Sequence, residues 1–235
     1  MSATSAPSGK PHCQLSILPV RPTWVSAPRI IRADDPGRAT AIAEAVLAVG
    51  QFIVYPTETF YGLGTRADLP SAVERLIRLK ERDTGKPIPV IAASADIARA
   101  TLQMTDDLVS LADAFWPGPL TVAAPPREDL PRGLLGSGTT LGLRVSSHPV
   151  AVQMAVAAGG LITATSANLS GGHPAQSIQE LDPALACSLI VDGGRTAGGA
   201  PSTVVGMAQG CVRILRGGAI AADAISRVVG YEVDS

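Results

Sequence analysis

The densest group of side chains able to bind a ligand lies between Phe52 and Gly64, in the sequence Phe-Ile-Val-Tyr-Pro-Thr-Glu-Thr-Phe-Tyr-Gly-Leu-Gly. A short apolar run ends at Pro56, and hydroxyl, carboxylate and aromatic groups follow it at once. A strand that ends in a polar loop is a usual way for an α/β sheet to present side chains to a ligand. An ordinary strand-to-helix loop has a similar composition. We predict one wall of a binding site here, with Gly62 and Gly64 turning the chain away beneath the ligand.

A second candidate group is basic. Lys80 falls on the same predicted helix face as Leu76 and Ile77, which should point into the protein. A charged group there is unfavourable unless it has a partner or lines a wet cavity. Arg82 can face the same anion if the helix ends close to these residues. Basic residues in a last helical turn can also simply complement the helix dipole, but lysine and arginine pair readily with phosphates, so the segment favours anion binding.

Further polar and basic groups follow several other predicted strands. Small hydroxyls, an amide and two glycines in residues 165–172 would let main-chain N–H groups converge on an anion. Arg144 emerges from an apolar strand and presents a planar fork suited to a carboxylate. Residues 201–205 add two more hydroxyls, and Arg213 and Arg216 lie close behind them. Together these groups indicate a ligand cleft at the ends of separate strands.

Hydrophobic periodicity predicts how the chain would position these groups. From Asp34 onward, runs typical of strands alternate with helical spacing, and Pro36, Pro70 and Pro149 each start a predicted helix. Strands are expected at residues 52–55, 88–92, 120–124, 139–145, 161–164, 189–191, 203–205 and 212–215. We expect one α/β domain over residues 34–235, with a twisted mixed β-sheet flanked by helices and an open basic cleft.

Residues 1–33 differ from the rest of the chain, because they are rich in proline and basic residues and contain no acidic residue. This composition predicts an N-terminal arm that is disordered or loosely docked. An organellar transit peptide has a similar composition, but Pro19, Pro22 and Pro28 would interrupt the amphipathic helix that such a peptide needs.

Composition argues against several classes of protein. A net charge of −1 does not suit a protein that coats nucleic acid by charge alone. The three cysteines lack metal-ligand spacing and suit a reduced compartment. The apolar runs fall short of the ~20 residues that a membrane helix needs. The sequence also holds no Walker-type loop and no Gly-x-Ser-x-Gly motif. We expect a cytoplasmic protein with no membrane partner.

Several motifs, taken in order, resemble the YrdC family, and they cover about residues 38–220. They are Tyr55-Pro-Thr-Glu-Thr-Phe-Tyr-Gly-Leu-Gly64, Lys80-Glu-Arg82, Trp116-Pro-Gly-Pro-Leu-Thr121, Arg144, Ser166-Ala-Asn-Leu-Ser-Gly171 and Pro201-Ser-Thr-Val-Val205. The resemblance implies a YrdC-like fold, in the short form without an extra C-terminal domain, and L-threonylcarbamoyladenylate synthase activity. Such an enzyme uses L-threonine, bicarbonate and ATP with Mg²⁺. It passes threonylcarbamoyl-AMP to a tRNA threonylcarbamoyl transferase that modifies adenosine 37 of tRNA.

The resemblance also implies roles for individual residues. Thr57, Arg144 and Ser202 would hold threonine, with Arg144 on its carboxylate. Lys80 and Arg82 would be catalytic. The nucleotide would contact Arg82, Lys86, Thr140, Ser166, Asn168 and Arg216. No residue is assigned to a metal ion or to a general base.

Two alternatives to the synthase are open, and the first arises from departures from the family pattern. Asp83 stands where many relatives have proline, and Ile91 stands where some have a histidine near the threonine site. The chain could therefore be a catalytically different paralogue. It could also be an RNA-binding module with weak tRNA affinity, in which Arg75 and Arg78 of the basic helix contact RNA.

Overall fold

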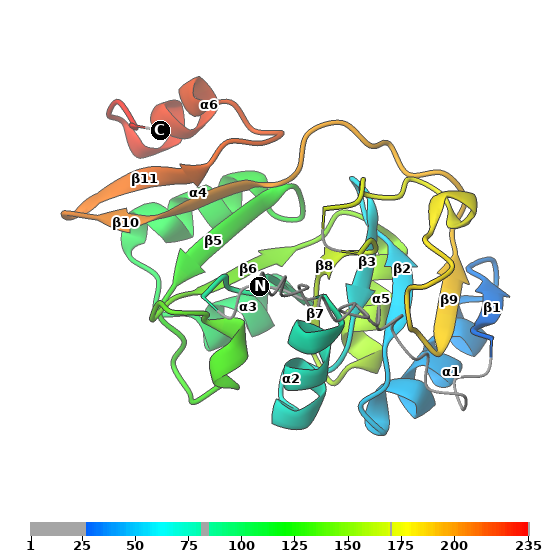
Figure 1. The fold of residues 1–235 in the computed structure, drawn as a ribbon. Helices are drawn as coiled ribbons and strands as arrows, with labels where there is room; N and C mark the ends of the chain where they lie inside the picture. The colour runs from blue at the N-terminus through cyan, green and yellow to red at the C-terminus, as the bar shows by residue number, and fades with distance from the viewer. Residues whose placement is uncertain (1–26, 81–84, 170, 235) are drawn as a thin grey trace, which may run out of the picture.

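The computed structural model describes residues 27–80, 85–169 and 171–234, which form two β-sheets with helices packed around them (Figure 1). The first sheet has the order β1-β9-β2-β3-β8 and the second the order β11-β10-β5-β6-β4-β7. The strands of the first sheet are β1 (Arg29–Arg32), β2 (Ile53–Pro56), β3 (Tyr61–Gly64), β8 (Thr165–Ser166) and β9 (Leu189–Asp192). Those of the second are β4 (Val90–Ala92), β5 (Leu120–Ala124), β6 (Leu141–Val145), β7 (Leu161–Thr163), β10 (Thr203–Ala208) and β11 (Cys211–Arg216).

Both sheets are mixed. In the first, β1 and β2 run parallel to β9, whereas β2 and β3 form an antiparallel hairpin in which Tyr55 lies opposite Gly62. In the second, β5 runs parallel to β10 and antiparallel to β6, and β4 runs parallel to β6. Parallel partners cannot be joined by a tight hairpin, so other elements lie between them in the chain.

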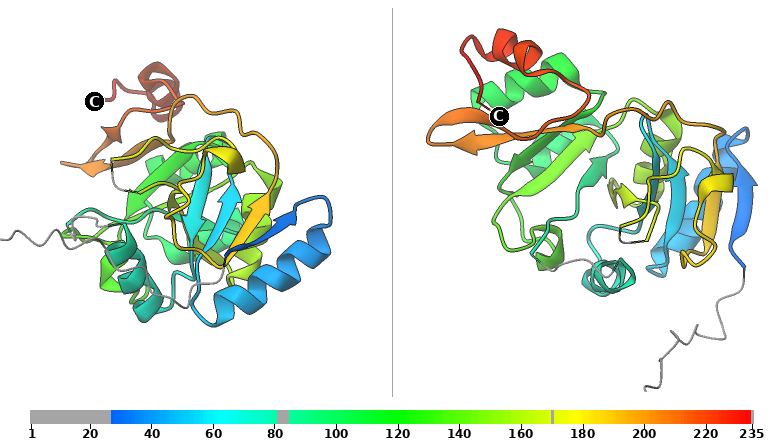
Figure 2. Two further views of the ribbon diagram at one scale, coloured as in Figure 1. Left: turned by 45° about the vertical axis from the view of Figure 1, so that its right-hand side comes forward. Right: turned by 45° about the horizontal axis from the view of Figure 1, so that its top comes forward.

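Helices lie at both ends of the molecule (Figure 2). The helices are α1 (Pro36–Ala48), α2 (Pro70–Leu79), α3 (Ala95–Thr101), α4 (Asp106–Phe115), α5 (Pro149–Ala157) and α6 (Ala222–Val229), with short 3₁₀ turns η1 (Arg132–Leu134) and η2 (Ile178–Glu180). α1 and α5 pack on each other and against β2, while α4 contacts α6 and β5. None of the helices among the described residues is long and apolar enough to cross a membrane.

Local signals in the sequence explain why α1 begins where it does. Oδ1 of Asp35 accepts a hydrogen bond from the backbone N–H of Arg38 at 3.0 Å, which satisfies one free donor of the first turn. Pro36 follows at the first helical position, where its missing N–H has no consequence. The predicted helix start is confirmed.

The mixed α/β class is confirmed, but the strands divide between two sheets where the sequence had suggested one. The role predicted for Gly62 and Gly64 is wrong, because both lie inside β3 rather than in a turn. A Cβ atom at Gly64 would lie 2.5 Å from the carbonyl oxygen of Thr163 and 2.8 Å from the ring of Tyr55. Glycine is therefore required there by close packing of the hairpin.

The folded part begins earlier than the predicted boundary at residue 34. Residues Arg29–Arg32, assigned to the N-terminal arm, form the edge strand β1 alongside β9. The backbone N–H of Arg29 donates to the carbonyl oxygen of Ser188 at 3.1 Å, which anchors this strand at its start. Residues 1–26 of the predicted arm lie outside the described residues.

Candidate functional site

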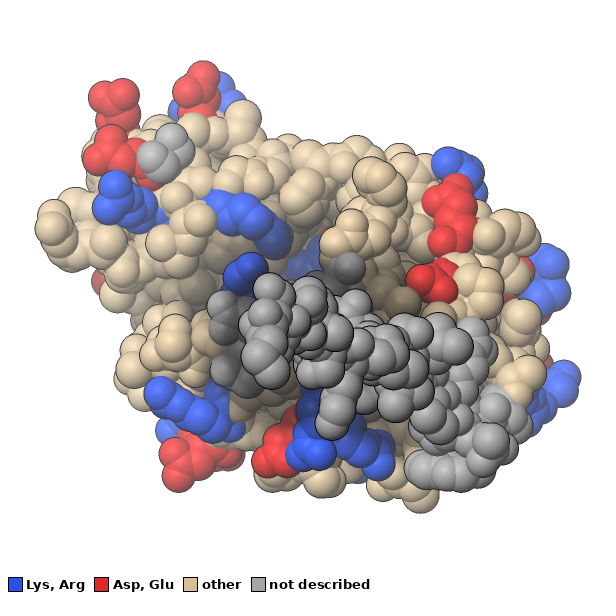
Figure 3. Space-filling model, in the orientation of Figure 1, with Lys and Arg blue, Asp and Glu red and all other residues tan. Residues whose placement is uncertain are grey.

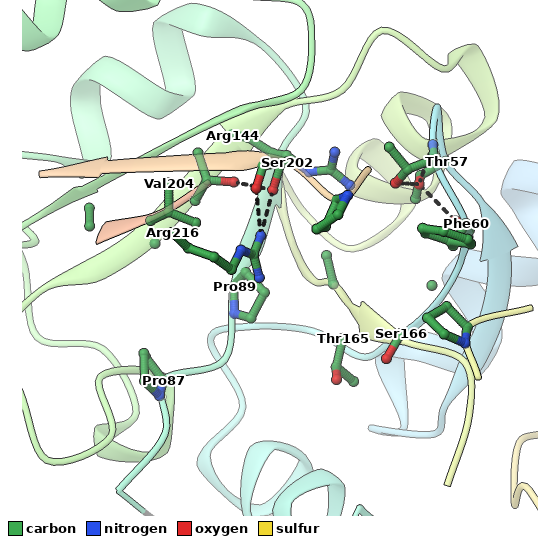
Figure 4. A pocket seen from close by; sticks show the side chains of 18 of the residues that line it. Thr57, Phe60, Pro87, Pro89, Arg144, Thr165, Ser166, Ser202, Val204 and Arg216 are labelled. Carbon is green, nitrogen blue, oxygen red and sulfur yellow. Dashed lines mark hydrogen bonds between the residues drawn. The ribbon is translucent and has the colours of Figure 1, made fainter. Parts of the chain in front are cut away.

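A cavity of about 530 Å³ lies between the β2–β3 hairpin of the first sheet and the β5, β6, β10 and β11 strands of the second (Figure 4). This volume falls within the range usual for small-molecule sites. Ser202 and Arg216 lie on one side of the cavity and Thr57 and Phe60 on the other (Figure 4). A ligand in this cavity would touch both sheets at once.

Most of the residues predicted for the site are brought together here. The cavity lining includes Thr57, Thr140, Arg144, Ser166, Ser202 and Arg216. These residues come from the first half and the second half of the chain, and strand pairing places them around one space. Their roles toward a ligand stay predictions.

Thr57 is fixed in the turn of the β2–β3 hairpin. Its Oγ1 donates to the carbonyl oxygen of Phe60 at 2.7 Å and accepts from the backbone N–H of Thr59 at 3.3 Å. The side chain is buried, yet it lines the cavity. The turn thus presents a hydroxyl group in one orientation.

Arg144 is a buried cation in β6, at the floor of the cavity. Its Nη1 donates to Oε1 of Glu58, and Oγ of Ser146 donates to the other oxygen of the same carboxylate. Burial lowers the pKa of Arg144 to about 10, so the guanidinium stays protonated at neutral pH. A buried, oriented guanidinium that faces a cavity suits a carboxylate ligand.

Ser202 and Arg216 form a second polar group, on the β10–β11 side. Nη2 of Arg216 donates to the carbonyl oxygen of Ser202 at 2.7 Å and to its Oγ at 3.0 Å (Figure 4). Oγ of Ser202 also lies 2.9 Å from Oγ1 of Thr121. These bonds hold a hydroxyl pair and a second guanidinium across the cavity from Thr57.

Lys80 does not line the cavity. This side chain is 6% exposed, and its Nζ donates to the carbonyl oxygen of Ser166 at 2.8 Å, to the carbonyl oxygen of Asn168, and to Oδ1 of Asn168 at 3.3 Å. The predicted inward direction of Lys80 is confirmed, and its partners include carbonyl groups of the 166–168 segment. The lysine therefore holds that segment in place.

The remaining predicted contacts lie away from the cavity or cannot be placed. Lys86 is exposed and does not belong to the lining. Asn168 is also outside the lining, and its Nδ2 donates to the carbonyl oxygens of Leu169 at 2.8 Å and Gly172 at 2.6 Å. Arg82 and Asp83 lie outside the described residues.

Replacement of Lys80 by alanine is expected to lower the free energy of unfolding by about 1–3 kcal/mol, because two loop carbonyl groups lose a buried, charged donor. Urea denaturation followed by circular dichroism measures this difference. The exposed Lys86 offers a matched control, and Lys86→Ala should change stability by less than about 0.5 kcal/mol. An unchanged unfolding midpoint for Lys80→Ala would contradict a structural role for this lysine.

Sequence reasoning missed several residues of the lining, among them Thr59, Thr121 and Leu215. Thr59 and Thr121 stand inside motifs that the sequence had already singled out, so their hydroxyl groups could have been included. Leu215 is 54% exposed at the cavity. An apolar side chain in a short strand gives no sequence signal that separates a lining residue from a core residue.

The described lining residues carry two guanidinium groups and no carboxylate. Lys and Arg side chains are also exposed near the middle of the face shown in Figure 3. Anionic ligands are therefore favoured. The lining offers hydroxyl groups but no acidic ligand set for a divalent cation, and no cluster of three potential metal ligands exists within the described residues.

Ile91, the position where some relatives have a histidine, belongs to the core. Ile91 is fully buried in β4, lies opposite Arg144 of β6, and packs in the same apolar cluster as Tyr55. Ile91 does not contribute to the cavity lining.

A model of the family described as Telomere recombination, which groups Sua5, YciO and YrdC proteins, matches residues 45–218. The chain belongs to this family. The matched range includes the cavity residues from Thr57 to Arg216.

Individual members of the Sua5/YciO/YrdC family are also similar in sequence to this chain. A threonylcarbamoyl-AMP synthase from Klebsiella pneumoniae is 36% identical over 166 residues, which are 69% of this chain and 87% of the relative. The threonylcarbamoyl-AMP synthase from Pyrococcus abyssi is 32% identical over 80% of this chain, and this chain spans 56% of the length of that relative.

Solved structures share the fold. The crystal structure of P. abyssi Sua5 complexed with L-threonine has a TM-score of 0.80 at 29% identity, and the match covers 89% of this chain and 63% of that one. The structure of E. coli YciO has a TM-score of 0.71 at 24% identity, with 83% of this chain and 97% of YciO covered, which supports the fold alone.

The basic helix that motivated an RNA-binding alternative is largely occupied by internal contacts. The guanidinium of Arg75 donates to the carbonyl oxygen of Gly50 and lies 5.5 Å from the ring centroid of Phe52. Arg78 pairs with Glu74 one turn away at 3.2 Å. These contacts engage Arg75, whereas the Arg78 side chain is 76% exposed, so the helix by itself adds no support to the alternative.

Proposed function

We propose that this chain is an L-threonylcarbamoyladenylate synthase, which makes threonylcarbamoyl-AMP and pyrophosphate from L-threonine, bicarbonate and ATP. The observation that carries the proposal is the match to the L-threonine complex of P. abyssi Sua5 over 89% of this chain. The cavity supports it, because a buried guanidinium and oriented hydroxyl groups line one space between the two sheets.

In the proposed reaction the amine of threonine captures CO₂ as a carbamate. A carbamate oxygen then forms a bond to the α-phosphorus of ATP, while the bond from that phosphorus to the β-phosphate oxygen breaks and pyrophosphate leaves. Positioning and cationic stabilisation can supply most of the rate of such a phosphoryl-group reaction. No described side chain at the cavity is assigned as a general base.

In this proposal, some of the chain's residues bind threonine and others bind ATP. Arg144 holds the threonine carboxylate, and Thr57 and Ser202 approach the rest of that amino acid from opposite sheets. ATP enters as its magnesium complex and contacts Thr140, Ser166 and Arg216, which lie in the same lining. The guanidinium of Arg216 supplies positive charge where the phosphates would lie.

The test is pyrophosphate release by the purified protein with bicarbonate and Mg-ATP. We expect release that requires L-threonine, at least about tenfold above the rate without it, because the carbamate nucleophile forms only on the amino acid. L-serine and glycine serve as matched amino acids that lack one or more groups of threonine. Release that is independent of any amino acid, or no release at all, would contradict the proposal.

The product is proposed to pass to a tRNA threonylcarbamoyl transferase as a separate partner. Adding such a transferase and tRNA to the reaction should yield threonylcarbamoylated adenosine, detectable by nucleoside mass spectrometry. If tRNA modification occurred equally well without this chain, the chain would not be the source of the threonylcarbamoyl group.

A further inference from the structure

Glu58 connects the two sheets directly beneath the cavity. It lies in the turn between β2 and β3 in the first sheet, and its carboxylate contacts Arg144 and Ser146 at the end of β6 in the second. The side chains of Arg144 and Glu58 are only 9% and 12% exposed. Removing either partner of such a buried ion pair leaves the other charge buried and unpaired, which is strongly destabilising.

Glu58 does not belong to the cavity lining. Its neighbours Thr57 and Thr59 line the cavity, and so does Arg144. Within the described residues, Glu58 is the hydrogen-bond partner of the Arg144 side chain, because Nη1 of Arg144 donates to Oε1 of Glu58. Glu58 therefore holds one nitrogen of the guanidinium, and the other nitrogens remain for a ligand. A guanidinium has five N–H donors, so it can serve two carboxylates on different edges.

Ser146 fixes the opposite oxygen of the Glu58 carboxylate. Its Oγ donates to Oε2 of Glu58 and accepts from the backbone N–H of His148 at 3.1 Å, where α5 begins. Ser146 is 1% exposed. The carboxylate is thus held at both oxygens by groups of the second sheet, although its own backbone belongs to the first.

We propose that Glu58, supported by Ser146, is the positioning residue that aims Arg144 at the carboxylate of the amino-acid substrate and sets the spacing between Arg144 and Thr57. This inference rests on the proposed function. Arg144 and Thr57 belong to different sheets, so the distance between these two contacts to one small ligand depends on a link between the sheets. Glu58 supplies that link, one residue away from Thr57.

The proposal predicts a selective effect on carboxylate recognition. In Glu58→Ala, Arg144 loses the carboxylate that fixes its orientation and can adopt another rotamer. The dissociation constant for L-threonine should therefore rise about tenfold or more. L-threoninamide has the same side chain and amine but no carboxylate charge, and its binding should change little. The preference for threonine over threoninamide should therefore shrink. The KM for ATP should stay within about threefold, because ATP is held mainly by other residues.

Isothermal titration calorimetry with L-threonine and L-threoninamide measures this preference in the full chain. Glu58→Gln keeps the size and an oxygen acceptor, so it should fold normally and lie between the wild type and Glu58→Ala. Ser146→Ala should cause a smaller rise in the same direction. Glu74→Gln, which makes the same acid-to-amide change at an exposed helix pair, should leave both dissociation constants unchanged.

Two outcomes would overturn the proposal. Equal weakening of threonine and threoninamide in both Glu58 variants would indicate a merely structural role. Tighter threonine binding would show that Glu58 competes with the substrate for Arg144 instead of orienting it. Failure of the proposed function would be separate and visible in the wild-type protein, which would then bind no threonine at all.

Discussion

Arg144→Ala is expected to reduce threonine-dependent pyrophosphate release about a hundredfold or more, since truncation of one partner of a buried charge pair costs roughly 2–5 kcal/mol. Two effects combine in this variant. The substrate carboxylate loses its proposed cationic partner, and the Glu58 carboxylate is left buried without the guanidinium that donates a hydrogen bond to it. Steady-state kinetics at varied threonine and at saturating ATP measure the loss.

The matched variant is Arg144→Lys, which keeps the positive charge but lacks the planar fork. A lysine can serve one carboxylate as a point charge but cannot bind two carboxylates on separate edges. We expect this variant to recover only part of the activity. If Arg144→Ala retained a wild-type kcat/KM for threonine, the assignment of Arg144 to the substrate carboxylate would be wrong.

Gly64→Ala should lower the free energy of unfolding by about 2–4 kcal/mol, a large effect for a single methyl group. The added carbon would lie 2.5 Å from the carbonyl oxygen of Thr163 and 2.8 Å from both Ile162 and Tyr55. One of these neighbours is backbone and the other two are fully buried, so none can move without disturbing the core. Thermal and urea denaturation of the purified variant measure the loss.

Gly138→Ala is the control for the Gly64 substitution. Its added carbon would meet its nearest neighbour, the carbonyl oxygen of Leu135, at 3.5 Å, which is ordinary contact. Stability should change by less than about 0.5 kcal/mol. Equal stability of Gly64→Ala and the wild type would mean that β3 does not pack against Thr163 and Tyr55 as described.

Local patterns in the sequence predicted most helices and strands because their signals are short-range. The proline after Asp35 and the apolar run at Leu120–Ala124 each lie within a few residues of the element that they define. The division into two sheets could not be predicted in this way. Strand partners such as β1 and β9 are far apart in sequence, and periodicity within either strand carries no information about the other.

The hairpin at residues 53–64 shows a different limit. Gly62 and Gly64 looked like turn residues, since glycine commonly marks a change of chain direction. The real turn lies just before them, at residues 57–60, and the glycines serve close packing against Tyr55 and Thr163. The sequence shows that glycines occupy these positions. Why glycine is needed there depends on neighbouring residues that only the folded chain brings close.

Lys80 illustrates how much of a candidate site a sequence can specify. Its predicted burial is confirmed, and the helix spacing was sufficient to predict it. The partner was not predictable, because the carbonyl oxygens of Ser166 and Asn168 are backbone groups brought in by β8. Every residue carries a backbone carbonyl group, so a sequence motif does not show which of them will accept a hydrogen bond.

The order of synthesis gives the two-sided cavity a further consequence. Thr57 leaves the ribosome early, whereas Ser202 and Arg216 belong to β10 and β11 and their flanks, near the end of the described chain. Domains generally fold as units during synthesis at about 5–20 residues per second. A nascent chain would therefore carry half of an amino-acid site for several seconds without the strands that complete it. Such a chain should be unable to retain a ligand in this cavity until β10 and β11 pair with the rest of the second sheet.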